Sequence, residues 1–96
     1  MFPGFTSKLS ESILASATSI TVKSDIVRVT GATQIDTIIG NFGGGFSGFL
    51  VLIPTDGAVT LGAGGNINVG IAMGQNRAVF LVYSKLAAKW FINSGV

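Results

Sequence analysis

The sequence contains no cysteine and no histidine. Without cysteine the chain can form no disulfide, and zinc, which prefers thiolate and imidazole ligands, is not expected. Histidine is the side chain that most often transfers protons near neutral pH, so acid–base catalysis lacks its usual residue. No base stands out that would activate a serine or threonine as a nucleophile. We therefore expect no enzyme, no metal site and no other cofactor.

Charged residues are also scarce, at 10% of the chain against about 25% in ordinary soluble domains. Nothing in the spacing of the carboxylates indicates a paired acid and base, and the acidic pattern of a calcium loop is absent. These carboxylates are Glu11, Asp25, Asp36 and Asp56. The six cations are dispersed along the sequence, whereas binding to phosphates requires a cluster on one face, so nucleic acid is not an expected partner.

Long hydrophobic runs are missing although 48% of the residues are hydrophobic and the mean hydropathy is +0.65. No run approaches the roughly 18–20 residues of a membrane span, and Ser10, Glu11 and Ser12 interrupt any secretory signal. A single domain of 96 residues buries only about 60–65% of its unfolded surface. We therefore expect another protein chain, not a membrane, to cover the surplus, in an obligate oligomer or a larger assembly.

Glycine is abundant, and the segment 40–67 contains much of it. Asp56-Gly57 lies between two apolar runs, a pattern that predicts a tight hairpin between strands 48–54 and 58–61. Residues 43–48 match G-x-G-x-x-G, but the nucleotide-binding form of this motif precedes a helix, and a strand is expected here. We interpret the match as a coincidence in a glycine-rich chain.

Short apolar runs separated by glycine, aspartate and asparagine turns predict about eight strands. The pattern is typical of a small all-β antiparallel sandwich or barrel. The expected strands are residues 19–23, 25–30, 34–39, 48–54, 58–61, 66–71, 78–83 and 87–93.

The strands predict a single β domain over residues 19–96, preceded by an N-terminal arm over residues 1–18. Within the arm, residues 7–17 fit either a weak, serine-rich helix or an extended segment. The arm is either a frayed end or an anchor on a neighbouring chain, and the abundance of apolar residues favours the anchor. Its anchoring residues would be Phe2, Phe5 and Leu9.

Two expected strands, 49–53 and 78–83, are apolar on both faces. A strand with one solvated face shows polar residues at every second position, so both faces of these strands are expected to be covered. A neighbouring subunit is the natural second cover, although two central core strands would give the same pattern. The predicted subunit contact consists of Phe49, Leu50, Phe80, Leu81 and Val82.

The segment 25–37, DIVRVTGATQIDT, resembles a module that recurs in the virion surface proteins of tailed bacteriophages. The resemblance continues in order from about Ile20 to Asn93. Its further pieces are the glycine-rich loop 43–48, the apolar strand 48–53, Asp56-Gly57-Ala58 with Thr60-Leu61, Gly64-Gly65-Asn66-Ile67, the strand 80–83 and Lys89-Trp90-Phe91. It implies a β-rich module, often trimeric, of fibres and capsid exteriors, and it brings no catalytic residues.

Together these features favour a non-enzymatic capsid decoration, or cement, protein located on the virion surface. It would bind the major capsid protein as a homo-oligomer, expected to be a trimer, with the arm residues Phe2, Phe5 and Leu9 on the shell. The alternative is a short tail-fibre or receptor-binding module whose glycine-rich loops contact host glycans. Neither nucleic acid nor membrane is an expected partner.

Overall fold

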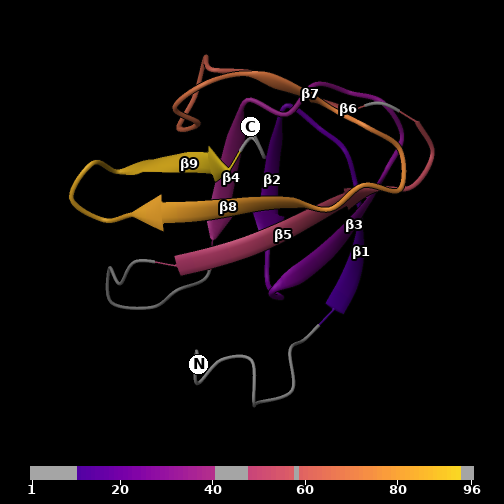
Figure 1. Cartoon of the computed structure of the whole chain (residues 1–96), viewed down its shortest axis with the longest axis horizontal. Coiled ribbons are helices and arrows are strands. Elements are labelled where there is room, and N and C mark those ends of the chain that lie inside the picture. The colour runs from indigo at the N-terminus through magenta and orange to yellow at the C-terminus, as the bar shows by residue number, and fades with distance from the viewer. Residues whose placement is uncertain (1–10, 41–47, 58, 94–96) are drawn as a thin grey trace.

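A computed structural model describes residues 11–40, 48–57 and 59–93 (Figure 1). All regular structure in these residues is β, so the all-β expectation is confirmed. The described ranges contain no helix that could cross a membrane. The strands are β1 (Glu11–Ala15), β2 (Ser19–Val22), β3 (Ile26–Thr30), β4 (Thr37–Gly40), β5 (Gly48–Pro54), β6 (Val59–Leu61), β7 (Ile71–Met73), β8 (Val79–Ser84) and β9 (Lys89–Asn93).

The largest layer is a five-stranded sheet with the order β1-β3-β5-β8-β9. Two smaller ladders, β2-β4 and β6-β7, complete the fold, and Figure 1 shows β2 and β4 crossing the direction of β8 and β9. The expectation of purely antiparallel pairing is wrong, because β1-β3, β3-β5 and β2-β4 are parallel. The reason is that the first five strands alternate between the two layers. Two successive crossings, with one strand of the other layer between them, return the chain to its first layer in the same direction, as parallel pairing requires.

The hydrophobic core lies between the five-stranded sheet and the smaller ladders. Alternation along each strand places every second side chain of the sheet in this core. The sheet contributes Val27, Val29, Leu50, Leu52, Leu81 and Trp90. The facing ladders and loops contribute Ile20, Val22, Ile35, Ile38, Val59, Leu61, Ile67 and Met73. Among the described residues no polar or charged side chain is buried, so this core is held by apolar packing.

The predicted hairpin at Asp56-Gly57 is wrong. β5 and β6 belong to different layers, and β5 pairs instead with β3 and β8. The Asp56 carboxylate accepts a hydrogen bond from the backbone N–H of Gly31 at 2.9 Å. The Asp-Gly pair is therefore a corner where the chain leaves the sheet for the opposite layer, and aspartate serves it by bonding a neighbouring backbone group.

The segment 66–71 also differs from its expected strand. Ile67 is buried and forms only an isolated bridge with Trp90, Val69 is 48% exposed, and regular pairing starts at Ile71 in β7. The alternation of apolar residues predicted a strand, but the backbone of Asn66 and Asn68 bonds only to Trp90 of β9 and does not extend a ladder. The other predicted strands are present, with ends that agree or differ by at most three residues.

The predicted arm is partly inside the domain. Residues 11–15 form β1 and pair in parallel with β3, so the helical alternative is wrong for this stretch and the domain begins before residue 19. The pairing could not be read from a serine-containing sequence with weak alternation. The anchoring residues Phe2, Phe5 and Leu9 lie outside the described residues, as does most of the glycine-rich loop, residues 41–47.

A cluster of hydrogen bonds around Trp90 joins the layers, and we call Ile38, Asn66 and Trp90 the clasp. The Asn66 amide pairs with the backbone of Ile38 at both ends: its Nδ2 donates to the carbonyl at 2.7 Å, and its Oδ1 accepts from the N–H at 2.9 Å. The indole Nε1 of Trp90 donates to the same carbonyl at 3.0 Å. The backbone N–H of Trp90 donates to the Asn66 carbonyl at 2.8 Å. Asn66 thus links β4 to β9: its side chain bonds the backbone of Ile38 as a neighbouring strand would, and its carbonyl bonds the backbone of Trp90.

Replacing Asn66 by alanine should destabilise the protein by about 1–3 kcal/mol, because both backbone groups of Ile38 lose a partner in a partly buried site. Urea unfolding measured by circular dichroism tests this value. Asn68→Ala is the matched control, since the exposed Asn68 contributes its backbone N–H to Trp90 and keeps it after substitution. Equal losses in the two variants would contradict the role of the clasp.

Candidate interaction surface

The five-stranded sheet has a second face, which points away from the core. We call the side chains on it the outer face. Strand alternation assigns to it the residues that flank each core position. Its apolar members are Ile13 on β1, Ile26 on β3, Phe49, Val51 and Ile53 on β5, Phe80 and Val82 on β8 and Phe91 on β9. Apolar residues therefore occur on the outer face of all five strands.

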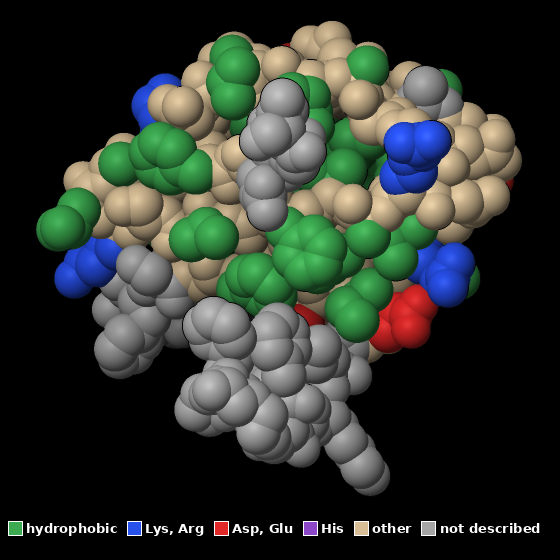
Figure 2. All heavy atoms as spheres, in the orientation of Figure 1, with side chains coloured by type: hydrophobic (Ala, Val, Ile, Leu, Met, Phe, Trp, Pro, Cys, Tyr) green, Lys and Arg blue, Asp and Glu red, His purple; other side chains and the backbone are tan. Residues whose placement is uncertain are grey.

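The centre of the outer face is aromatic and exposed. Phe49 is 36% exposed, Phe80 41%, Val82 49% and Phe91 40%. Val82 lies directly between Phe49 and Phe91 in the strand register, and the rings of Phe49 and Phe80 meet at 5.8 Å with a tilt of 55°. Figure 2 shows apolar side chains gathered over the middle of the molecule, where Figure 1 places β5 and β8. A contiguous exposed patch of this kind is typical of a protein contact.

The predicted subunit contact is divided by the sheet. Phe49, Phe80 and Val82 lie on the outer face, whereas Leu50 and Leu81 lie on the inner face with 1% and 0% exposure. Leu50 and Leu81 are paired with each other in register and pack in the core. Their assignment to a subunit contact is therefore wrong, because adjacent residues of a strand point to opposite sides and only one set remains accessible.

Sequence reasoning missed several residues of the outer face. Phe91 had a signal: it follows Trp90, so one of the two aromatic side chains had to point away from the core. Val51 had one too, because alternation along strand 49–53 places it on the same face as Phe49. Ile13 and Ile26 gave no such signal, because their positions depend on the parallel pairing of β1 and β3.

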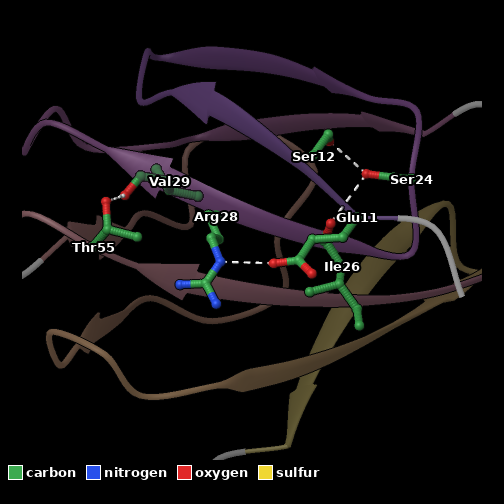
Figure 3. Close-up of polar contacts among 7 residues, drawn as sticks. All are labelled: Glu11, Ser12, Ser24, Ile26, Arg28, Val29 and Thr55. Atoms are coloured by element: carbon green, nitrogen blue, oxygen red, sulfur yellow. Dashed lines mark hydrogen bonds and ion pairs between the residues drawn. The ribbon is translucent and has the colours of Figure 1, made fainter.

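The β1 and β3 end of the outer face carries charge. Nε of Arg28 lies 2.7 Å from Oε2 of Glu11, and both side chains are about half exposed (Figure 3). An exposed pair of this kind contributes about 0–1 kcal/mol. Ser12, whose side chain lies on the opposite side of β1 from Glu11, bonds Ser24 at 2.5 Å, and Ser24 donates to the Ile26 carbonyl at 3.1 Å. Lys89, on the outer side of β9, lies at the opposite end. An apolar centre with polar ends is the usual anatomy of a protein interface.

Other functional chemistry is sparse in the part of the chain that the structure describes. No three aspartates or glutamates there lie close enough together to hold a metal ion. Trp90, the aromatic residue best suited to stack on a sugar, is fully buried against Tyr83 with ring centres 5.3 Å apart. The exposed aromatic residues of the described ranges are those of the outer face, which makes this surface the candidate functional site.

The division between the faces predicts different effects for neighbouring residues. Leu81→Ala should lower the free energy of unfolding by about 2–5 kcal/mol, because it leaves a cavity in a fully buried site. Val82→Ala should cost less than about 1 kcal/mol, because half of this side chain is already in water. Urea denaturation of both variants, at a concentration low enough to exclude association, measures the difference. A larger loss for Val82→Ala would contradict the assignment of the faces.

No family model, curated protein or solved structure matches this chain. Its function is therefore inferred from the outer face, the composition and the ordered motifs described above.

Proposed function

We propose that this protein is a capsid decoration protein of a tailed bacteriophage. It binds the major capsid protein on the outside of the virion as a homo-oligomer, with three copies expected, and stabilises the shell without catalysing a reaction. The observation that carries the proposal is the exposed apolar outer face on a small all-β domain. The ordered series of motifs from about Ile20 to Asn93 supplies the assignment to phage surface proteins.

The size of the outer face supports a contact with a second copy. Five strands about 4.8 Å apart, each with about five residues of roughly 3.3 Å, cover roughly 24 by 17 Å. That is about 400 Å² in projection, and protruding side chains add to the accessible area. A standard interface buries about 800 Å² on each partner. The outer face therefore supplies in projection about half of the area that one partner buries in a standard interface, before the protruding side chains are counted.

The proposed stabilisation of the shell rests on buried apolar area. Each square ångström of apolar surface removed from water contributes about 25 cal/mol, partly offset by the freedom that is lost on binding. An oligomer that touches several capsid subunits adds such area across their junctions. In this proposal the outer face residues Phe49, Phe80 and Val82 hold the copies together. The residues Phe2, Phe5 and Leu9 contact the shell.

The self-association is tested with two valines of equal exposure. Val82→Asp on the outer face should abolish the outer-face association and lower the mass of the oligomer, because a charge at the centre of an apolar contact is desolvated without a partner. Val69→Asp should leave the mass unchanged, since Val69 has 48% exposure against 49% for Val82 and lies in the loop before β7. Light scattering coupled to size exclusion measures the mass. A wild-type protein that is monomeric at all concentrations would refute the proposed contact.

Binding to the shell is tested by co-sedimentation with expanded, empty phage capsids. The wild-type protein should sediment with the capsids up to a saturating ratio, and a chain lacking residues 1–7 should lose this binding while it keeps its oligomeric mass. Absence of wild-type binding would refute the decoration function. Retained binding by the shortened chain would refute the role of the arm.

The alternative, a short tail-fibre or receptor-binding module, is favoured by one observation. Phe49, Phe80 and Phe91 form an exposed aromatic surface, and aromatic faces can stack on sugar rings. Binding to a glycan array that is lost in Phe80→Ala, without binding to capsids, would favour this alternative over decoration.

A further inference from the structure

The two edges of the five-stranded sheet differ in whether their outward backbone groups are hydrogen-bonded within the described residues. The β9 edge is covered: Ile67 bridges Trp90, and the backbone N–H of Asn68 donates to the Trp90 carbonyl at 2.8 Å. At the other edge, β1 pairs with β3 on one side, and no strand within the described ranges pairs with its other side. An open edge presents a row of backbone donors and acceptors that can template another strand.

The backbone groups at the open edge can be assigned. The N–H of Ser16 donates to the Thr30 carbonyl on β3 at 2.8 Å. Successive residues of a strand direct their N–H and C=O groups to opposite sides, so Leu14 and Ser12 also face β3. The N–H and C=O groups of Glu11, Ile13 and Ala15 therefore point away from the sheet. The side chains of the same three residues lie on the outer face, and all three are exposed.

Of the features that protect natural edge strands, β1 has one charged residue, Glu11, and it lacks lysine, proline and a bulge. Natural edges carry lysine or proline, or they bulge, so that a second strand cannot pair. The sequence of β1, ESILA, contains neither residue and pairs with β3 in uninterrupted register. Its central residue, Ile13, is 70% exposed, the largest exposure of any outer-face apolar residue.

We propose that β1 pairs antiparallel with β1 of a second copy, with Ile13 opposite Ile13 of that copy. The two sheets then form one continuous sheet, and the outer faces of both copies lie on the same side. The contact is separate from the outer-face contact of the proposed function and does not depend on capsid binding.

A second copy fits this edge because β1 is complementary to itself. With Ile13 on the two-fold axis, the three outward-facing residues match in pairs, and each such pair exchanges two hydrogen bonds. The exposed isoleucine side chains meet across the axis and extend the apolar outer face into the second copy. Symmetry of this kind gives a closed contact that uses the same residues on both sides.

The charge of β1 selects the same arrangement. Glu11 is the one charged residue of the strand, and it forms an ion pair with Arg28 of its own chain. In the antiparallel register Glu11 lies opposite Ala15 of the second copy. The two Glu11 residues are then four positions apart along the ladder, roughly 13 Å, so like charges are not opposed.

Single cysteines test the pairing, since the native chain has none. Cα atoms in a directly opposed hydrogen-bonded pair are about 5.5 Å apart, within the usual range for a disulfide. Ile13→Cys should therefore form a disulfide dimer under mild oxidation, several-fold faster than two controls at equal concentration. Glu11→Cys has its counterpart too far away, and Ile39→Cys places the thiol on an exposed isoleucine of β4. Equal rates for the three variants would overturn the proposal.

A second variant separates strand pairing from mere proximity. Ala15→Pro removes an N–H that points away from β3, so the intramolecular ladder is kept while pairing with another copy is blocked. Combined with Ile13→Cys it should reduce dimer formation to the level of Ile39→Cys, with circular dichroism showing that the fold persists. Undiminished cross-linking in the folded double variant would overturn the proposal.

The outer-face contact is removed by combining Ile13→Cys with Val82→Asp. The disulfide dimer should still form, whether or not the wild-type protein binds capsids, because the edge contact does not use Val82. Loss of the cross-link in this combination would show that Ile13 approaches its counterpart only through the outer-face contact, and would overturn the edge pairing.

Discussion

The carbonyl oxygen of Ile38 is the point at which the two layers of this protein are joined by hydrogen bonds. It accepts bonds from the indole of Trp90 on the five-stranded sheet and from the amide of Asn66 in the loop before β7. The loop in turn bonds both backbone groups of Trp90: the Asn66 carbonyl accepts from its N–H, and the Asn68 N–H donates to its carbonyl. Because apolar packing has little directional preference, these bonds fix how β4 is placed against β9. The register of the opposing layer therefore depends on them.

The clasp also explains why the two edge strands of the five-stranded sheet, β9 and β1, differ in how far they are covered. It covers the β9 edge of the sheet, and no comparable loop covers β1 among the described residues. The inner face of the sheet is filled by the smaller ladders, while no strand of the described ranges covers the outer face, which remains apolar. In the contacts proposed above, the outer face and the β1 edge are the two surfaces that bind other chains.

The alternation of the first five strands between layers is the second constraint on the fold. It makes the neighbours β1, β3 and β5 parallel, because a strand of the other layer lies between each two of them in the sequence. The connecting segments have to cross from one layer to the other, and Asp56 assists one crossing by bonding Gly31. An Asp-Gly pair is equally suited to a hairpin and to such a corner. Its backbone preference specifies a turn, but it does not specify which strand the following strand pairs with.

The sequence by itself determined the class of the fold and most of the strands, because alternation and turn residues are local properties of the chain. It also determined that β5 and β8 are apolar on both sides, and hence that apolar surface remains after folding. Only the tertiary structure decided which side is inside: Leu50 and Leu81 entered the core, and Phe49, Phe80 and Val82 were left outside. Only the tertiary structure showed that residues 11–15 form an edge strand, and that the side chain of Asn66 bonds the backbone of Ile38. These outcomes depend on pairing between segments distant in sequence, which no local pattern specifies.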